Sequence, residues 1–141
     1  MSAKALAEAR EISKLLMDVA DLTKDIFSNI AADLEVPVQQ ARALCLLESP
    51  VSMSELAAQL GCDKSYITPL ADQMEAGQLI SRVPGPDRRT KLLELSGKGR
   101  LLRKQLERSV QNFSPMMVTL TQQERQVFGQ LLEKILSAYN V

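Results

Sequence analysis

The sequence predicts a mainly α-helical fold with one small β-hairpin, in which a winged helix-turn-helix core lies between long N-terminal and C-terminal helices. Three observations support this prediction. Apolar residues recur at three- and four-residue steps over most of the chain. Two short helical segments joined by a glycine-containing turn lie near its middle, and a proline- and glycine-rich turn between two β-type runs follows. The 141 residues are enough for one domain with its own core.

The first two helices are expected from apolar periodicity and from proline. Residues 5–31 carry an apolar stripe at helical spacing, formed by Ile12, Leu15, Leu16, Val19, Leu22, Ile26 and Ile30. Pro37 suits a first helical turn, so a second helix is expected from Val38 to Glu48, where Ser49 and Pro50 end it.

A helix-turn-helix is expected next. Ser52 and Glu55 have capping-box spacing and open a short helix that ends at Gly61. Asp63 is a good N-cap for the following helix, residues 64–76, which ends at Gly77. The residues expected to face the core from this helix are Ile67, Leu70, Ala71 and Met74.

A β-hairpin and two further helices follow. Residues 79–83 and 91–95 are expected strands, and the turn PGPDRRT between them forms a wing. Ser96 is expected to cap a helix that runs to about Phe113, and Pro115 interrupts the helical pattern. Thr121 and Glu124 form a second capping box before the last helix.

We therefore expect a single domain, residues 1–141, in which residues 37–96 form the winged helix-turn-helix and residues 5–31 and 97–141 form dimerisation helices. The terminal helices are too long and too apolar for the small core to cover them, so a second copy of the chain is the simplest partner. The alternative is that they pack against each other within one chain.

The composition argues against several classes of function. The chain has no histidine, which removes the Ser-His-Asp, Cys-His and common zinc arrangements, and no glycine-rich phosphate loop is present. We therefore expect no enzyme, no cofactor and no metal. The longest uncharged run, residues 109–123, contains Gln, Asn, Ser and Pro, and the N-terminus lacks an apolar signal segment. No membrane association is expected, and the expected location is the cytoplasm.

Charge is unevenly distributed along this neutral chain. Between Arg82 and Lys104, eight basic residues face two acids, so this segment carries +6 and the remainder −6. A basic patch of this kind is typical of nucleic-acid binding. The alternative for the PGPDRRT turn is a solvated loop without a partner.

The order of elements and three local motifs resemble the MarR family of winged-helix regulators. The first motif is the helix-turn-helix SELAAQLGCDKSYITPLADQMEAGQLI. The second is D-x-R followed by L-x-L-[ST]-x-x-G, here Asp87, Arg89, Leu93, Leu95, Ser96 and Gly99. The third is the closing LTQQERQVFGQLLEKIL. The resemblance spans nearly the whole chain.

This resemblance implies a homodimer that binds double-stranded DNA at a pseudo-palindromic operator, commonly as a repressor. The recognition helix of such proteins enters the major groove, and the wing tip enters the adjacent minor groove. Asp87 is expected to hold the guanidinium of Arg89 in an extended pose, and Asp72 to pair with Arg82 or to accept from cytosine. The full set of expected DNA-binding residues is Lys64, Ser65, Tyr66, Thr68, Pro69, Gln73, Arg82, Asp87, Arg88, Arg89 and Lys91.

The chain departs from the family pattern within the recognition helix. Many members carry arginines in a pattern like T-R-L-V-D-R-L-E, where this chain has Pro69 and Gln73. Pro69 also removes the backbone hydrogen bond to the carbonyl of Ser65, which then faces DNA or water. The missing arginines leave open a second function, a protein-interaction module without operator binding.

The resemblance also implies regulation by a small anionic or phenolic effector or by cysteine oxidation. Flexible apolar side chains suited to an effector site are expected at Met17, Phe27, Met116 and Met117, with ordinary packing as the alternative. Cys45 lies among leucines and is expected to be inert. Cys62 precedes a helix N-terminus, so redox sensing at this thiol is the alternative to a small apolar plug.

Overall fold

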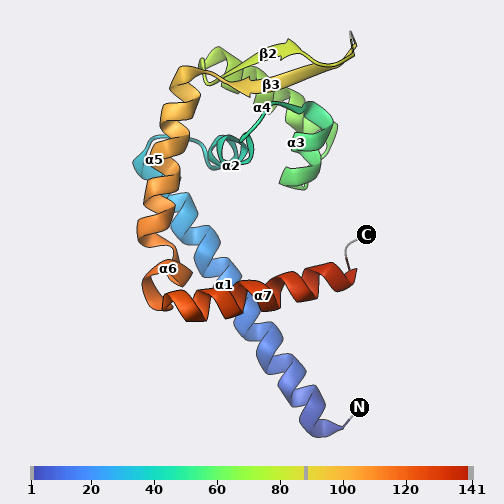
Figure 1. Ribbon diagram of the computed structural model, residues 1–141, viewed down its shortest axis with the longest axis vertical. Helices are drawn as coiled ribbons and strands as arrows, with labels where there is room; N and C mark the ends of the chain where they lie inside the picture. Colours follow the sequence, from blue (N-terminus) through green and yellow to red (C-terminus); the bar gives the residue numbers. More distant parts are fainter. Residues whose placement is uncertain (1, 88, 140–141) are drawn as a thin grey trace. The chain divides into compact units, whose positions relative to one another are not determined.

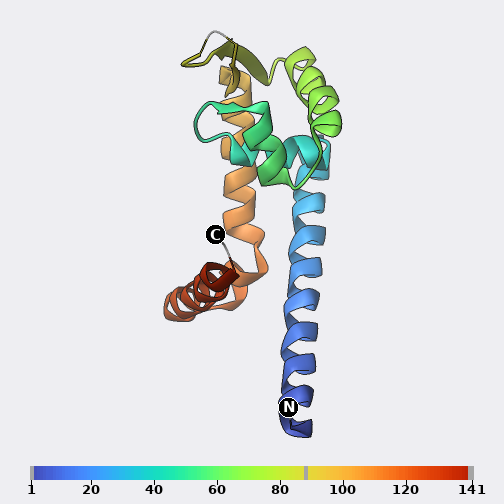
Figure 2. The same cartoon turned by 90° about the vertical axis from the view of Figure 1, so that its right-hand side faces the viewer.

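The computed structural model describes residues 2–87 and 89–139, which form two compact units. One unit comprises residues 28–109, and the other combines residues 1–27 with residues 110–141. Figures 1 and 2 show the elements of both units, and the first helix, α1 (Ala3–Asp33), contributes residues to each of them. The expected mainly helical fold with a small β-sheet is confirmed.

The unit of residues 28–109 contains the helix-turn-helix. Its helices are α2 (Val38–Leu46), α3 (Met53–Leu60) and α4 (Lys64–Ala76). The side chains expected to face the core from α4 are all buried. The Ser52 hydroxyl accepts from the Glu55 amide at 3.1 Å, and Gly61 ends α3 at φ 67°, where glycine is favoured. These features fix the turn between α3 and α4.

The wing belongs to a three-stranded antiparallel sheet rather than to an isolated hairpin. Strands β2 (Ile80–Pro84) and β3 (Lys91–Leu95) pair as expected, and β1 (Val51–Ser52) pairs with the other edge of β3. β1 was not predicted, because two residues are too short to produce a strand pattern. Its partner residue Leu93 is fully buried, so β1 covers part of the core.

The start of helix α5 (Gly97–Phe113) is tied to the turn between α4 and β2. The Ser96 hydroxyl donates to the Gln78 carbonyl at 2.6 Å and accepts from the Gly99 amide at 3.0 Å, while the Ser96 amide donates to the Leu79 carbonyl at 2.9 Å. The Lys98 ammonium donates to the Gly77 carbonyl at 3.1 Å. Gln78 itself has φ 62°, so the turn is sharp. Three hydrogen bonds therefore hold this junction, and the bond from the Gly99 amide caps the start of α5.

The other unit contains the N-terminal part of α1, the end of α5, and two more helices, α6 (Pro115–Thr119) and α7 (Gln122–Tyr139). The expected capping box at the start of α7 is confirmed. The Glu124 carboxylate accepts from the Thr121 amide at 2.9 Å, and the Thr121 hydroxyl accepts from the Glu124 amide at 3.2 Å. Pro115 interrupts the helical pattern as predicted, but it also opens α6, which was not predicted.

Candidate nucleic-acid interface

Helix α4 presents a polar surface while its other side is held in the core. The candidate residues on this surface are exposed: Lys64, Ser65, Tyr66, Thr68, Pro69 and Gln73. Tyr66 is 47% exposed, whereas Ile67 beside it is fully buried. The helix is therefore anchored by one face and free to contact a partner with the other.

The first turn of α4 leaves backbone donors available. Asp63 occupies the expected N-cap position, but within the described residues its carboxylate forms no capping hydrogen bond. The Tyr66 and Ile67 amides donate to the Asp63 carbonyl at 3.0 and 3.2 Å. The amides of Lys64 and Ser65 precede these bonds at the positive end of the helix dipole, which is suited to a phosphate group.

Pro69 lies inside α4 without ending it. A proline has no N–H, so the Ser65 carbonyl receives no bond from the position four residues later. One residue earlier, the Lys64 carbonyl accepts from the Thr68 hydroxyl at 3.3 Å. The exposed side of the first two turns thus offers a carbonyl acceptor beside hydroxyl and ammonium donors.

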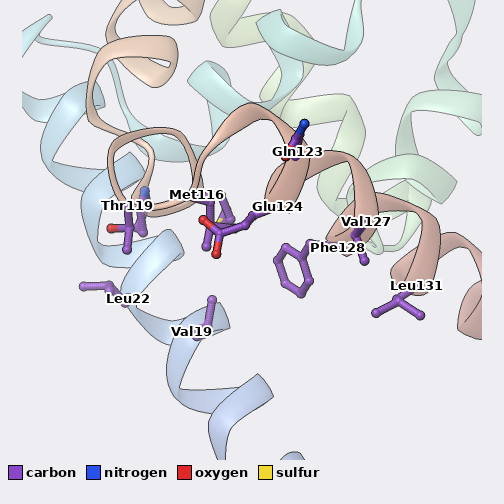
Figure 3. A pocket seen from close by; sticks show the side chains of 11 residues that line it. Val19, Leu22, Met116, Thr119, Gln123, Glu124, Val127, Phe128 and Leu131 are labelled. Carbon is purple, nitrogen blue, oxygen red and sulfur yellow. The ribbon is translucent and has the colours of Figure 1, made fainter.

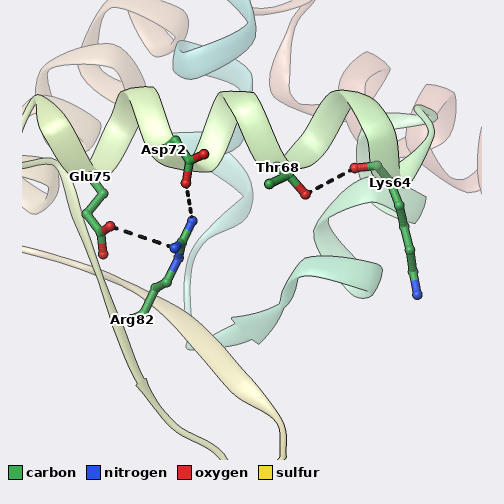
Figure 4. A network of polar contacts seen from close by, with 5 residues as sticks. All are labelled: Lys64, Thr68, Asp72, Glu75 and Arg82. Atoms are coloured by element: carbon green, nitrogen blue, oxygen red, sulfur yellow. Dashed lines mark hydrogen bonds and ion pairs between the residues drawn. The ribbon is translucent and has the colours of Figure 1, made fainter.

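Arg82 of β2 forms ion pairs with two acids of α4 (Figure 4). Its Nη2 lies 2.6 Å from Oδ1 of Asp72, and its Nη1 lies 3.8 Å from Oε1 of Glu75. Of the two partners predicted for Asp72, the pairing with Arg82 is confirmed. The contact to Glu75 was not predicted, although its position three residues after Asp72 places it on the same helix face.

The wing tip is a tight turn with an exposed arginine. The Gly85 amide donates to the Thr90 carbonyl at 2.8 Å, and a Cβ at Gly85 would also lie 2.8 Å from that oxygen, so a larger residue does not fit. Oδ1 of Asp87 accepts from the Arg89 amide at 2.8 Å. Arg89 and Lys91 are exposed, and the expected contact Arg88 lies outside the described residues.

The predicted contact between Asp87 and the guanidinium of Arg89 is corrected by this geometry. The carboxylate of Asp87 binds the backbone of Arg89 and closes an Asx turn. An aspartate reaches the amide two residues later with little loss of side-chain entropy, whereas a guanidinium in solvent is long and flexible. Asp87 therefore fixes the position of the Arg89 backbone but not that of the Arg89 guanidinium.

The two cysteines lie in different surroundings in the unit of residues 28–109. Burial raises the pKa of the Cys45 thiol, and the nearby charge of Glu107 raises it further, against a smaller opposing effect of Arg103. A raised pKa lowers the thiolate fraction at neutral pH, as expected for an inert cysteine. Cys62 is half-buried at the turn before α4.

The four candidate effector residues all belong to the unit that contains α6 and α7, but they are not gathered in one pocket. Met116 lines an open apolar groove of about 660 Å³ between α1, α6 and α7, and its Sδ accepts from the Thr23 hydroxyl at 3.9 Å. Figure 3 shows Phe128 of α7 in this groove, facing Val19 and Leu22 of α1. Met17 and Met117 are exposed and Phe27 is half-buried, and none of the three lines the groove.

Two further features of the described residues bear on the class of protein. No helix among them is long and apolar enough to cross a membrane. In the same ranges, 2–87 and 89–139, no group of three or more acidic or cysteine side chains is arranged to hold a metal ion.

Part of the winged helix-turn-helix is similar to a known protein family. The MarR family model matches residues 37–91, which include α2, the helix-turn-helix, β2 and the turn of the wing, and which end at the first residue of β3. Among curated proteins, none matches the chain significantly.

Solved structures match over nearly the whole chain. A MarR family protein from Bacillus stearothermophilus is 25% identical, with a TM-score of 0.77 over 100% of this chain and 99% of that one. The apo form of wild-type MarR from E. coli is 23% identical, with a TM-score of 0.74 over 88% of this chain and 95% of that one. A cysteine-to-serine mutant of E. coli MarR, solved in complex with operator DNA, is 23% identical, with a TM-score of 0.73 over 92% and 96% of the two chains.

Proposed function

We propose that this chain, whose residues 37–91 match the MarR family model, is a sequence-specific DNA-binding repressor that acts as a homodimer and is released by a small ligand. The observation that carries this proposal is the two-sided character of α4. Ile67, Leu70 and Met74 bury one side of the helix, and polar side chains cover the other. An anchored helix with short polar side chains on its exposed face is suited to reading the major groove.

Within the proposed interface, α4 supplies both phosphate and base contacts. Lys64 and the free amides of the first turn are suited to the phosphate backbone. Ser65, Tyr66, Thr68 and Gln73 are suited to base edges or phosphates, and Pro69 leaves the Ser65 carbonyl as an acceptor for an amino group of cytosine or adenine.

The wing supplies the second proposed contact. Asp87 binds the backbone amide of Arg89, so the Arg89 side chain extends from a backbone position that is fixed within the turn. Narrow minor grooves have a strongly negative potential that favours an inserted arginine. Lys91, at the start of β3, and Arg88 are proposed to contact the flanking phosphates.

The proposed dimer rests on the apolar surface of the unit that contains α6 and α7. Leu15 and Leu22 of α1 are 57% and 49% exposed, and Leu131 and Ile135 of α7 are 54% and 58% exposed. Exposed apolar residues repeated along two helices are unfavourable in water and typical of an interface with a second copy. The groove lined by Val19 and Phe128 is open and apolar, as such an interface requires.

The proposed effector would act through the same unit. Met17, Phe27, Met116 and Met117 offer flexible apolar surface, and a ligand there must favour the DNA-free shape by about 1–3 kcal/mol to weaken binding 5–150-fold. Release of DNA by salicylate-like acids, with Cys62→Ser behaving as wild type, would support this mechanism. Release by peroxide alone, abolished by Cys62→Ser, would replace it with cysteine sensing.

A gel shift with the DNA upstream of the protein's own gene tests the proposed function. The protein should shift this fragment at concentrations that leave a shuffled fragment of the same length unbound. Equal binding of both fragments, or of neither, would instead favour an interaction module without an operator. A regulator of this kind would work in the cytoplasm with its DNA.

A further inference from the structure

Arg82 differs from the other basic residues of the wing because its charge is already engaged. Asp72 and Glu75 of α4 hold the two terminal nitrogens of its guanidinium, at 2.6 and 3.8 Å. Its side chain is 30% exposed, and its Nε is buried without a hydrogen-bond partner among the described residues. Figure 4 shows the side chain reaching from β2 to the flank of α4.

We propose that Arg82 is a positioning residue, which fixes the wing against the recognition helix and neutralises the acids of that helix, and that it does not itself contact DNA. This inference rests on the proposed function of the chain as a DNA-binding regulator. It assigns to Arg82 a role different from those of Arg89 and Lys91, although all three belong to the same basic segment.

Arg82 balances the charge of the recognition helix. Helix α4 carries one base, Lys64, and two acids, Asp72 and Glu75, so its own net charge is −1. A helix that approaches phosphates with uncompensated carboxylates is repelled by them. Arg82 brings the sum of these four charges to zero, and it does so from the strand next to the helix.

Arg82 also joins β2 to α4 at a second point. The turn from α4 into β2 is already held by hydrogen bonds from Ser96 and Lys98 to the carbonyls of residues 77–79. The ion pair of Arg82 adds a second fixed point farther along the same strand. Two points define the direction of β2 relative to α4, so the wing tip and the recognition helix are held in one arrangement.

The ion pairs of Arg82 are too exposed to contribute much to the stability of the fold. The side chains of Asp72 and Glu75 are 59% and 44% exposed. Ion pairs so open to water contribute little to folding stability, because solvent screens them and the side chains lose entropy. The arrangement of α4 and β2 toward DNA is therefore the effect expected to depend on them.

A double-mutant cycle tests this inference with wild type, Asp72→Asn, Arg82→Gln and the double variant, each titrated against the operator fragment at several salt concentrations. We expect Arg82→Gln to weaken binding by at least about tenfold, because two carboxylates then face DNA without a counter-charge. Adding Asp72→Asn should recover part of that loss, because only one of the two uncompensated carboxylates is then neutral. Glu94→Gln with Arg100→Gln, an exposed ion pair 3.6 Å apart on β3 and α5, is the matched control cycle, in which no such recovery is expected.

A direct contact between Arg82 and a phosphate predicts a different result. Asp72→Asn would then change the affinity by the same factor in Arg82→Gln as in wild type, and the slope of log affinity against log salt would fall by about 0.9 for the lost contact. That result would overturn the inference and leave the proposed function intact. Failure of the wild type to bind any operator fragment would overturn the proposed function instead.

A measurement without DNA keeps the inference testable if a variant binds poorly for other reasons. Hydrogen exchange followed by mass spectrometry should be faster in the β2–β3 hairpin of both single variants than in the wild type, and no faster in the double variant than in either single one. Unchanged exchange of the hairpin in Asp72→Asn and in Arg82→Gln would overturn the positioning role.

Discussion

At the scale of single residues, Arg89 is the side chain on which DNA affinity should depend most. It is exposed at the wing tip, and its backbone is held by Asp87. We expect Arg89→Ala to weaken operator binding by roughly 1–3 kcal/mol without lowering the melting temperature. A fluorescence anisotropy titration measures the loss. Arg108→Ala, which removes the same charge from an exposed position on α5, is the control, and wild-type affinity in Arg89→Ala would refute the wing contact.

Gly99 is the position at which the addition of a single methyl group should disturb the core most. A Cβ at this position would lie 2.1 Å from the Leu79 carbonyl oxygen and 3.1 Å from its carbon, so α5 would have to move away from the turn. We expect Gly99→Ala to lower the free energy of unfolding by roughly 1–3 kcal/mol. Gly97→Ala, where no atom lies within 4 Å, should change it by less than about 1 kcal/mol. Chemical denaturation compares the two variants, and equal effects would contradict this account.

At the scale of elements, the capping box makes the start of α7 sensitive to acid. The hydrogen bond from the Thr121 amide lowers the pKa of Glu124 below its ordinary value, and the bond with the Thr121 side chain adds to this. A lowered pKa in the folded state means that the stabilising effect is present above the unfolded pKa and is lost as the pH falls through the folded one. Thr121→Ala should therefore lower the melting temperature near neutral pH, because it removes one of the two hydrogen bonds of the cap.

Thermal unfolding of wild type and Glu124→Gln at several pH values checks this prediction. The difference in melting temperature should be largest at neutral pH and should shrink as the carboxyl group protonates. A difference that stays constant down to acid pH would mean that the charge of Glu124 plays no part in the cap.

The elements that were predicted correctly are those whose own residues show a recognisable pattern, such as a capping residue or a glycine at a helix end. The hydroxyls of Ser52 and Thr121 cap helix N-termini, and Gly61 ends α3 at a positive φ. These three helix ends were therefore predicted correctly. Strand β1 has two residues and owes its existence to Leu93 across the sheet. Pro115 both interrupts one helix and opens the next, and the sequence pattern alone revealed only the interruption.

The candidate site was predictable in part for the same reason. The alternation of buried and exposed positions on α4 follows from helical periodicity. The contacts of Arg82 with Asp72 and Glu75 depend on how β2 lies against α4, which no local pattern encodes, so pairing was only one of two options for Asp72. The partner of Asp87 was mistaken because a backbone amide competes with a guanidinium for the same carboxylate.

At the scale of the whole molecule, the exposed apolar surface of α1 and α7 predicts a constitutive dimer. Light scattering at micromolar concentration should give twice the monomer mass. Leu131→Glu, which places a charge on this surface, should shift the mass toward the monomer and weaken operator binding with it. Gln126→Glu introduces the same charge at an exposed polar position of α7 and should leave the dimer intact. A monomeric wild type would exclude this mode of assembly.

The central claim is that two copies of α4 and of the wing read one two-fold symmetric DNA site. Selection of binding sites from a random double-stranded library by the purified protein tests it most directly. We predict an enriched pseudo-palindrome whose half-sites lie about 10 bp apart from centre to centre, with enrichment lost in Arg89→Ala. Recovery of a single unpaired half-site, or of no enriched sequence at all, would contradict it.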